Sequence, residues 1–393
     1  MTLARRVFNL GTETAFMVLA KAKELEAQGK DIVHLEIGEP DFDTPAHIKE
    51  AATQALRDGY THYVPAPGLT EVRQCIAENI NAWRGIEPDW RRVVVTPGAK
   101  PIMFFSILAL AERGTEVIYP NPGFPIYESM IRFCGARPVA MPLLEKNGYH
   151  PDLAQLARLV NERTRLIILN SPHNPCGCVM SKEDVQAVAD IVPLQKDLYV
   201  LSDEVYKDIL YEGKHHSIAS EPGMAQRTII LDGLSKSYAM TGWRLGYGLF
   251  PEPMVEHIVK LMVNSVSCAP AFSQRVFMAA LRGPQDGVAH MRQEFQQRRK
   301  VLVDGLRSIE GVRCALPEGA FYAFPNISGT GLSSQDFEAR ALNRAGVALL
   351  SGTAFGRYGE GHVRLSYANS VPNIKKAVER LADLVQGVAK ERN

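Results

Sequence analysis

One lysine stands among small and polar residues in the stretch Leu231-Asp232-Gly233-Leu234-Ser235-Lys236-Ser237-Tyr238-Ala239-Met240-Thr241-Gly242-Trp243-Arg244-Leu245-Gly246. Residues 228–231 are β-branched or apolar and predict a strand. Lys236 follows the end of this strand and is surrounded by small and polar residues. Covalent amine catalysis needs the neutral amine, so the surroundings of such a lysine must lower its pKa. A surface lysine in a polar loop fits this stretch equally well, and the rest of the chain has to decide between the two.

Seven short runs of mostly apolar residues predict strands between residues 93 and 250. They are residues 93–96, 116–119, 138–141, 165–169, 198–201, 228–231 and 245–250. Most of them are continuously apolar, which is typical of strands that helices cover on both faces. Helical patterns separate them, for example at residues 101–112 and 126–133. We therefore expect an α/β protein with a mainly parallel, seven-stranded sheet between helices.

The conspicuous residues of this region come directly after an apolar run. They are Gly98, Ala99, Lys100, Phe124, Asn174, Asp203, Tyr206, Ser235 and Lys236. In open α/β sheets, ligands bind at the carboxyl ends of the strands. We therefore expect these residues to meet at one rim of the sheet and to form a single site.

Two further segments flank the predicted sheet domain, which we assign to residues 46–285. Residues 1–45 contain a helical pattern at 13–28 and an apolar run at 32–36, and we expect them to pack with the C-terminal part. After a charged helix at 288–308, apolar runs follow at 312–315, 321–325, 348–351 and 363–366, with helices at 333–344 and 371–386. Residues 286–393 therefore predict a smaller α+β domain.

Composition argues against several classes of protein. The 393 residues include 44 basic and 43 acidic side chains, a net charge of +1, which gives no attraction to nucleic acid or to an anionic membrane. Six scattered cysteines fit reduced thiols, and no second Cys or His pair accompanies Cys176 and Cys178 to form a metal site. The longest apolar stretch, residues 102–111, is too short for a membrane span. We expect a cytoplasmic protein without a metal.

Three motifs carry a resemblance to a known family. They are Asn170-Ser171-Pro172-His173-Asn174-Pro175-Cys176-Gly177, Asp203-Glu204-Val205-Tyr206, and Ser235-Lys236 followed eight residues later by Arg244. In this order, each at a strand end, they resemble class I aminotransferases of fold type I, the pyridoxal-phosphate enzymes related to aspartate and aromatic aminotransferases. The resemblance extends over nearly the whole chain. It implies pyridoxal phosphate as the cofactor and a homodimer with shared sites.

The resemblance assigns the reacting groups. Lys236 matches the lysine that forms a Schiff base with the cofactor and then moves a proton between the substrate α-carbon and the cofactor C4′. Asp203 matches the carboxylate that keeps the pyridine nitrogen protonated. Tyr206 and Asn174 match the pair that hydrogen-bonds the phenolic oxygen of the cofactor. From the residues alone, Asp203 could equally cap a helix and Asn174 could form a turn before proline.

Further matches concern the cofactor phosphate and ring. The residues that match phosphate ligands are Ser235, Arg244 and, through their backbone amides at a helix start, Gly98, Ala99 and Lys100. Phe124 matches the aromatic residue that stacks on the ring. Tyr63 matches a tyrosine that reaches the phosphate in the partner subunit, although Tyr60 is close enough in sequence to compete for this assignment.

For the substrate, Arg364 matches the arginine that binds the α-carboxylate, with Gly38 and Asn174 near it. The neighbours of Arg364 in sequence are apolar, so an alternating strand directs Arg364 to the opposite face. Lys100 matches a lysine that binds a side-chain carboxylate in some relatives, but a solvated lysine at a helix start fits it as well.

The expected activity is transfer of an amino group between an L-amino acid and a 2-oxo acid in two half-reactions of ping-pong type. A pyridoxal-phosphate lyase, such as a carbon-sulfur β-lyase, is the alternative, because the same kind of site can eliminate. A sensor would need a further binding domain, and a nicotinamide dehydrogenase would need a Gly-x-Gly-x-x-Gly loop after an early strand; the sequence offers neither. The amino-acid donor and the oxo-acid acceptor stay open at this point.

Overall fold

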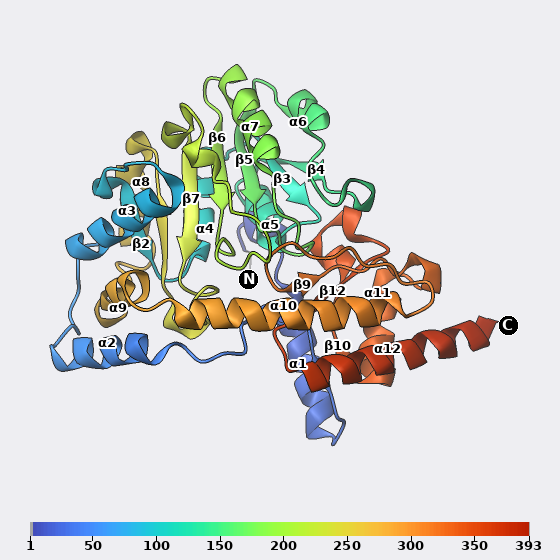
Figure 1. Cartoon of the computed structure of the whole chain (residues 1–393). Helices are drawn as coiled ribbons and strands as arrows, with labels where there is room; N and C mark the ends of the chain where they lie inside the picture. Colours follow the sequence, from blue (N-terminus) through green and yellow to red (C-terminus); the bar gives the residue numbers. More distant parts are fainter. Residues whose placement is uncertain (1–2, 393) are drawn as a thin grey trace.

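The centre of the structure is a sheet of seven strands in the order β2-β8-β7-β6-β5-β3-β4 (Figure 1). The structure is a computed structural model in which residues 3–392 are described. The strands are β2 (Val93–Thr96), β3 (Glu116–Asn121), β4 (Arg137–Pro142), β5 (Thr164–Asn170), β6 (Tyr199–Asp203), β7 (Thr228–Gly233) and β8 (Gly246–Leu249). Strand β8 runs antiparallel to β2 and β7, and all other neighbours in this sheet are parallel. The predicted α/β fold with a mainly parallel sheet is confirmed.

Helices surround this sheet and continue into the C-terminal part. They are α1 (Thr14–Ala27), α2 (Ala46–Arg57), α3 (Thr70–Arg84), α4 (Lys100–Leu110), α5 (Pro125–Phe133), α6 (Leu153–Leu159), α7 (Lys182–Ile191), α8 (Glu252–Ser265), α9 (Ala271–Arg282), α10 (Asp286–Arg307), α11 (Ser334–Arg340) and α12 (Val371–Arg392). A capping box of Ser181 and Asp184 opens α7. The sequence interpretation missed α6, α8 and α9, although Pro253 in the first turn of α8 is a helix-start signal.

The strands are continuously apolar because helices cover both faces of the sheet. In β5, Leu166 and Ile168 pack in a cluster with residues of α4, α5 and α8. Ile167 and Leu169 point to the opposite face and pack in a cluster with residues of α1 and α7. Successive side chains of a strand alternate between faces, so a strand that is buried on both sides needs apolar residues at every position.

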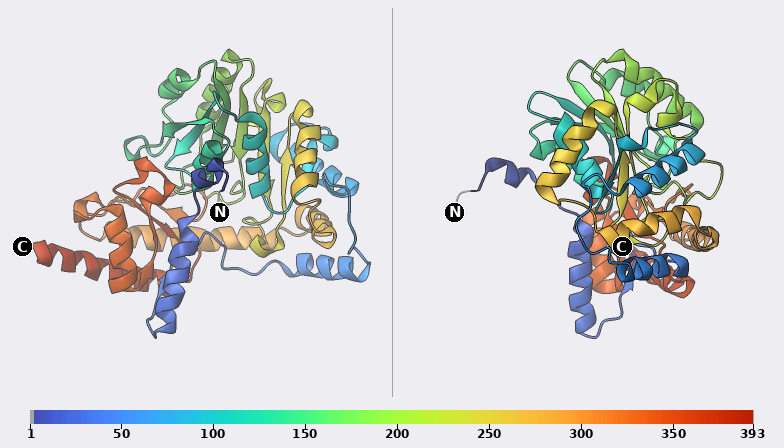
Figure 2. Two further views of the ribbon diagram at one scale, coloured as in Figure 1. Left: turned by 180° about the vertical axis from the view of Figure 1, so that it is seen from behind. Right: turned by 90° about the vertical axis from the view of Figure 1, so that its left-hand side faces the viewer.

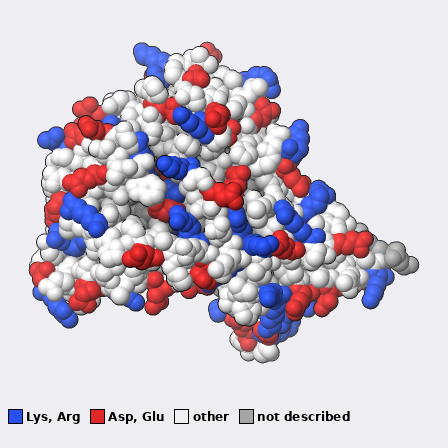
Figure 3. All heavy atoms as spheres, viewed as in Figure 1, with Lys and Arg blue, Asp and Glu red and all other residues white. Residues whose placement is uncertain are grey.

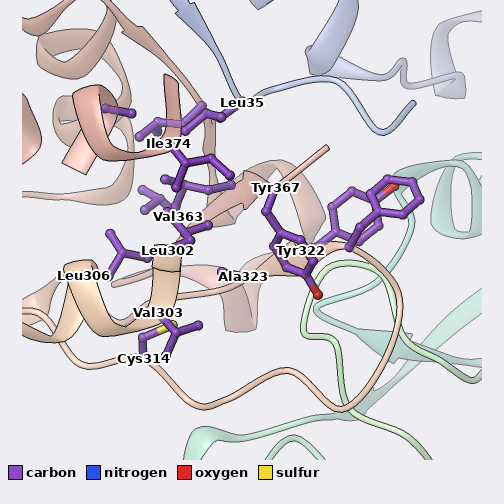
Figure 4. Packing of buried hydrophobic residues seen from close by; sticks show 14 of the residues in the cluster. Leu35, Leu302, Val303, Leu306, Cys314, Tyr322, Ala323, Val363, Tyr367 and Ile374 are labelled. Carbon is purple, nitrogen blue, oxygen red and sulfur yellow. The ribbon is translucent and has the colours of Figure 1, made fainter. Parts of the chain in front are cut away.

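The C-terminal part has its own core behind α10. Strands β9 (Tyr322–Ala323), β11 (Leu350–Ser351) and β12 (Val363–Ser366) form an antiparallel sheet in the order β11-β12-β9. Leu302, Val303 and Leu306 of α10 pack in the cluster that includes Val363 of β12 (Figure 4). This arrangement is the expected smaller α+β structure; the domain boundaries at residues 45 and 285 remain predictions.

Two strand predictions in this part were wrong. Residues 312–315 do not form a strand, because only Arg313 has a strand-like partner, the backbone of Asn326. The run 348–351 is divided between two sheets. Strand β10 (Val347–Ala348) pairs in parallel with β1 (Val33–His34), whereas β11 pairs with β12.

The N-terminal segment connects both parts of the molecule. Residues Val18, Ala22 and Leu25 of α1 lie in one cluster with the sheet residue Ile167 and with Ala348 of β10. Before α1, the short helix η1 (Arg5–Asn9) projects from the body in the side view of Figure 2. The apolar residues of this arm are exposed, among them Leu3, Val7, Phe8 and Leu10.

The surface carries both signs of charge. In Figure 3, Lys and Arg side chains are interspersed with Asp and Glu side chains over the visible face, without a large area of one sign. Over residues 3–392, the helices are too short or too polar to cross a lipid bilayer.

Candidate active site

A cavity of about 360 Å³ lies at the carboxyl ends of the central strands. The predicted residues that line it are Gly38, Ala99, Lys100, Phe124, Asn174, Asp203, Tyr206, Ser235, Lys236, Arg244 and Arg364. They come from many separate segments and meet because parallel strands end at the same edge of the sheet. A larger surface pocket of about 610 Å³ lies between α12 and residues 342–346, away from all of these residues.

Lys236 follows the end of β7 and extends its amine into the cavity. Its Nζ donates a hydrogen bond to the carbonyl oxygen of Gly38 at 2.6 Å. Burial lowers the pKa of the Lys236 amine to about 8. A usable fraction of the amine is therefore neutral near pH 7, as a nucleophilic lysine requires.

Asp203 ends β6 and is 8% exposed. The hydroxyl of Tyr127, on α5, donates a hydrogen bond to its Oδ2 at 2.5 Å. Burial raises the pKa of Asp203 to about 6, and the hydrogen bonds from Tyr127 and the Val205 amide offset only part of this effect. A cation beside Asp203 would restore its ionisation, which is the property expected of a partner for a protonated pyridine nitrogen.

Tyr206 and Asn174 face the cavity from the loops after β6 and β5. The hydroxyl of Tyr206 lies 2.8 Å from the hydroxyl of Tyr322 in β9. The backbone amide of Asn174 donates to Oδ1 of Asn170 at 2.9 Å, and Nδ2 of Asn170 donates to the Asp203 carbonyl at 3.1 Å. The loop that bears Asn174 is thereby fastened to the strand that bears Asp203.

Arg364 lies on β12 and is 4% exposed. Its Nη1 donates to Oδ1 of Asn174 at 3.1 Å, and its Nη2 donates to the carbonyl oxygen of Glu36 at 2.5 Å. Its Nε is buried without a hydrogen-bond partner among the described residues. A buried guanidinium whose contacts are neutral oxygens suits a carboxylate ligand, which would supply the missing charge and acceptor.

The other end of the cavity is suited to a phosphate. Gly98 has φ +85°, and a side chain at this position would collide with the guanidinium of Arg244. Only glycine therefore lets Arg244 lie against the turn that precedes α4. The free amides at the start of α4 and the positive charge of Arg244 together favour a phosphate.

The cavity mouth is formed by residues at the start of α1 and α4. Nζ of Lys100 makes an ion pair with Glu13 and lies 5.7 Å from the ring centroid of Phe124. Phe16 also lines the mouth. Lys100 therefore lines the cavity and is ion-paired with Glu13, while its side chain is still 48% exposed to solvent.

Two predicted residues lie outside the cavity wall. Gly98 does not line the cavity itself but leaves room for the guanidinium of Arg244, which does. Tyr63 is 89% exposed. Conversely, the sequence interpretation missed Tyr127, Tyr322 and Glu13, which all line the cavity. Tyr127 stands one helical turn after Phe124, a spacing that could have indicated it.

The residues present fit pyridoxal phosphate at three separate points. Asp203 suits the ring nitrogen, Arg244 suits the phosphate, and the Lys236 amine suits the aldehyde carbon. When bound, this cofactor supplies an electron sink for the bond that breaks at the substrate α-carbon. A sheet of this topology with these groups at one rim defines the pyridoxal-phosphate enzymes of fold type I.

Comparison with known proteins identifies the family. Residues 30–381 match the family described as aminotransferase class I and II. The aspartate aminotransferase of Pyrococcus horikoshii is 38% identical over 389 residues, which cover 98% of this chain and 97% of that protein. The aromatic-amino-acid aminotransferase 2 of Thermococcus litoralis is 39% identical over 365 residues, 92% of this chain and 93% of that protein.

A solved structure agrees with these sequence relatives. The aspartate aminotransferase from Thermus thermophilus with maleate superposes with a TM-score of 0.93 at 36% identity, covering 98% of this chain and 100% of that one. The chain belongs to the class I and II aminotransferase family. It is thus a pyridoxal-phosphate-dependent transaminase, as the resemblance implied.

Proposed function

We propose that the cavity at the strand ends is the catalytic site of this aminotransferase and that Lys236 is the residue that binds the cofactor covalently. The observation that carries this proposal is the buried Lys236 amine, whose pKa is lowered to about 8 in a cavity that also contains Asp203 and Arg364. With the cofactor and substrate bound, the Lys236 amine would be placed to act as the base at the substrate α-carbon and as the acid that returns this proton at C4′ of the cofactor.

The other side chains hold the two reactants. Asp203 would favour a proton on the ring nitrogen of the cofactor, because a buried carboxylate is stabilised by a cation. Arg364 binds the α-carboxylate of the substrate through its Nε and Nη atoms, assisted by Asn174 and Gly38. Tyr206 would donate a hydrogen bond to the phenolic oxygen of the cofactor, and Ser235, Arg244 and the amides at the start of α4 would hold its phosphate.

The donor is an L-amino acid and the acceptor a 2-oxo acid. Relatives named aspartate and aromatic-amino-acid aminotransferases support acidic or aromatic donors. Lys100 at the cavity mouth could bind a side-chain carboxylate once it leaves Glu13, whereas Phe16 and Phe124 could pack on an aromatic side chain. We favour an acidic donor, because Lys100 brings a cation to the cavity wall.

We also propose a homodimer in which Tyr63 reaches the cofactor phosphate of the partner subunit. Its 89% exposure supports this role, as do the exposed apolar residues Phe8, Met17 and Leu56. Mixing Lys236→Ala chains with Tyr63→Ala chains tests it. In a hybrid dimer, one site combines the intact Lys236 of one chain with the intact Tyr63 of the other. The mixture should therefore be more active than either variant alone. Activity no higher than that of Tyr63→Ala alone would argue against shared sites.

The proposed location is the cytoplasm. All six cysteines are free thiols, as is usual in a reducing compartment. Immunoblots of fractionated cells test this, and recovery of the protein outside the cytoplasmic fraction would contradict it.

The decisive experiment is an absorption spectrum of the purified protein before and after addition of single amino acids without an oxo acid. Conversion of the yellow cofactor to its amine form identifies the donors and establishes the first half-reaction. A band that persists while ammonia is released would favour the lyase instead. A protein that takes up no pyridoxal phosphate would contradict the whole assignment.

A further inference from the structure

Two tyrosines from different parts of the molecule meet in the cavity wall. Tyr206 belongs to the loop after β6 in the large sheet domain, and Tyr322 belongs to β9 of the C-terminal part. Their hydroxyl oxygens lie 2.8 Å apart, and Tyr322 is 1% exposed. The hydrogen bond therefore joins the two parts of the chain inside the site.

Tyr322 also contacts the group that we assign to the substrate carboxylate. The guanidinium carbon of Arg364 lies 4.5 Å from the ring centroid of Tyr322. A side chain on Gly38 would collide with the Tyr322 hydroxyl, so only glycine admits this hydroxyl at its place. The carbonyl of the same Gly38 accepts the hydrogen bond from Lys236.

The number of protons on the two phenols limits what Tyr206 can do. Each phenol has one hydrogen, and either hydroxyl of the pair can be the donor. If Tyr206 donates to Tyr322, its hydrogen is not available to the cofactor. If Tyr322 donates, the Tyr206 hydrogen is free to point into the cavity.

Arg364 decides between these two arrangements. A cation against the face of an aromatic ring is attracted by it, and it stabilises negative charge on the attached oxygen. The Tyr322 hydroxyl is therefore the more acidic of the pair and the better donor. A substrate carboxylate bound at Arg364 would weaken this effect, because it neutralises the guanidinium.

We propose that Tyr322 is a positioning residue that donates its hydrogen bond to Tyr206. This hydrogen bond directs the Tyr206 proton to the phenolic oxygen of the cofactor. Binding of a carboxylate at Arg364 then weakens the contact between Tyr206 and the phenolic oxygen. This inference rests on the proposed role of Tyr206. Tyr322 was not among the residues that the sequence predicted for the site. Through Tyr322, binding of a substrate carboxylate at Arg364 would change the pH at which the bound cofactor changes its absorbance.

Single and double substitutions test the proposal through the pH midpoint of the absorbance change of the bound cofactor. A hydrogen bond to the phenolic oxygen lowers this midpoint, so Tyr206→Phe should raise it by about one pH unit. Tyr322→Phe should raise it in the same direction by a smaller amount, because a hydroxyl that accepts a hydrogen bond is itself a stronger donor and Tyr206 then loses this polarisation. The double variant should not exceed Tyr206→Phe, because Tyr322 acts through Tyr206.

A second measurement probes the link to Arg364. Saturating succinate, a carboxylate that cannot transaminate, should raise the midpoint in the parent and should raise it less than half as much in Tyr322→Phe. Phenylalanine keeps the ring against Arg364, and circular dichroism checks that the fold is retained. The matched control is Tyr367→Phe, which removes a buried hydroxyl that contacts Tyr211 and Ala320 in the neighbouring core; its midpoint should equal that of the parent.

The outcomes separate this inference from the function on which it rests. A shift in Tyr206→Phe without any shift in Tyr322→Phe would overturn the role of Tyr322 alone. Additive shifts in the double variant would also overturn it. An unchanged midpoint in Tyr206→Phe would reject the proposed role of Tyr206 and, with it, this inference, whereas the role of Lys236 would stand.

Discussion

Nε of Arg84 donates a hydrogen bond to Oε2 of Glu204 at 2.8 Å, so that the residue directly after Asp203 is held by an ion pair with exposures of 1% and 0%. Arg84 also contacts Asp232 of β7 at 2.9 Å. Burial opposes ionisation of Glu204, but Arg84 and His215 outweigh it and lower its pKa well below its usual range. Two strands that deliver site residues, β6 and β7, are thereby joined beneath the cavity.

Arg84→Met should destabilise the protein by about 3 kcal/mol, because two buried carboxylates lose a shared cation, although Lys207 still contacts Asp232 and His215 still contacts Glu204. The free energy of unfolding from denaturant titration measures this loss. Arg282→Met is the control, since Arg282 pairs with Glu78 at the surface, where an ion pair contributes about 0–1 kcal/mol. Equal losses in the two variants would contradict the structural role of the buried pair.

Lys236→Ala should abolish turnover while the protein remains folded, because the other described amine that lines the cavity, Lys100, is 48% exposed and pairs with Glu13. Steady-state kinetics measure turnover, and borohydride reduction followed by mass spectrometry locates the cofactor on the chain. The parent should carry the cofactor on Lys236 and the variant should carry none. Turnover within tenfold of the parent would reject the assigned role.

Asp203 should make the stability of the cofactor-free protein depend on pH. Its pKa is raised by burial from 3.8 to about 6, so the folded protein holds this proton more tightly than the unfolded chain does. The stability contributed by the protonated side chain is therefore present below about pH 4 and is lost as the pH rises to about 6, a loss of about 3 kcal/mol.

Asp203→Asn tests this pH dependence, because asparagine does not titrate. Unfolding titrations at pH 4 and pH 7 should show the cofactor-free variant gaining up to about 3 kcal/mol relative to the parent at the higher pH. The same variant should lose most activity, since it no longer stabilises a charged ring nitrogen. A constant difference between variant and parent at both pH values would mean that folding does not raise the pKa of Asp203.

Lys100→Met should raise the KM for aspartate about tenfold or more and leave the KM for phenylalanine nearly unchanged, if Lys100 binds a side-chain carboxylate. Glu13→Gln is the companion variant: it frees Lys100 from its ion pair and should lower the KM for aspartate. Similar changes for both amino acids would instead assign Lys100 to the cavity wall and leave the acidic preference without support.

The sequence predicted the sheet well because the signal for a strand buried on both faces is local. All seven strands appear where apolar runs stand, and the residues after β6 and β7, among them Tyr206 and Lys236, reach one cavity. The less successful predictions lie in the C-terminal part. There, residues 312–315 have the composition of a strand, but only Arg313 meets a partner backbone.

What the sequence by itself determined is the order of the elements and the set of chemical groups, since hydrophobic period and turn residues act over a few positions. What only the tertiary structure decided is which of these groups touch. Tyr322 and Tyr206 are separated by 116 positions, and Arg84 and Glu204 by 120. Their pairing depends on how helices and strands pack, and the resulting burial sets the pKa values of Lys236 and Asp203, which no local pattern encodes.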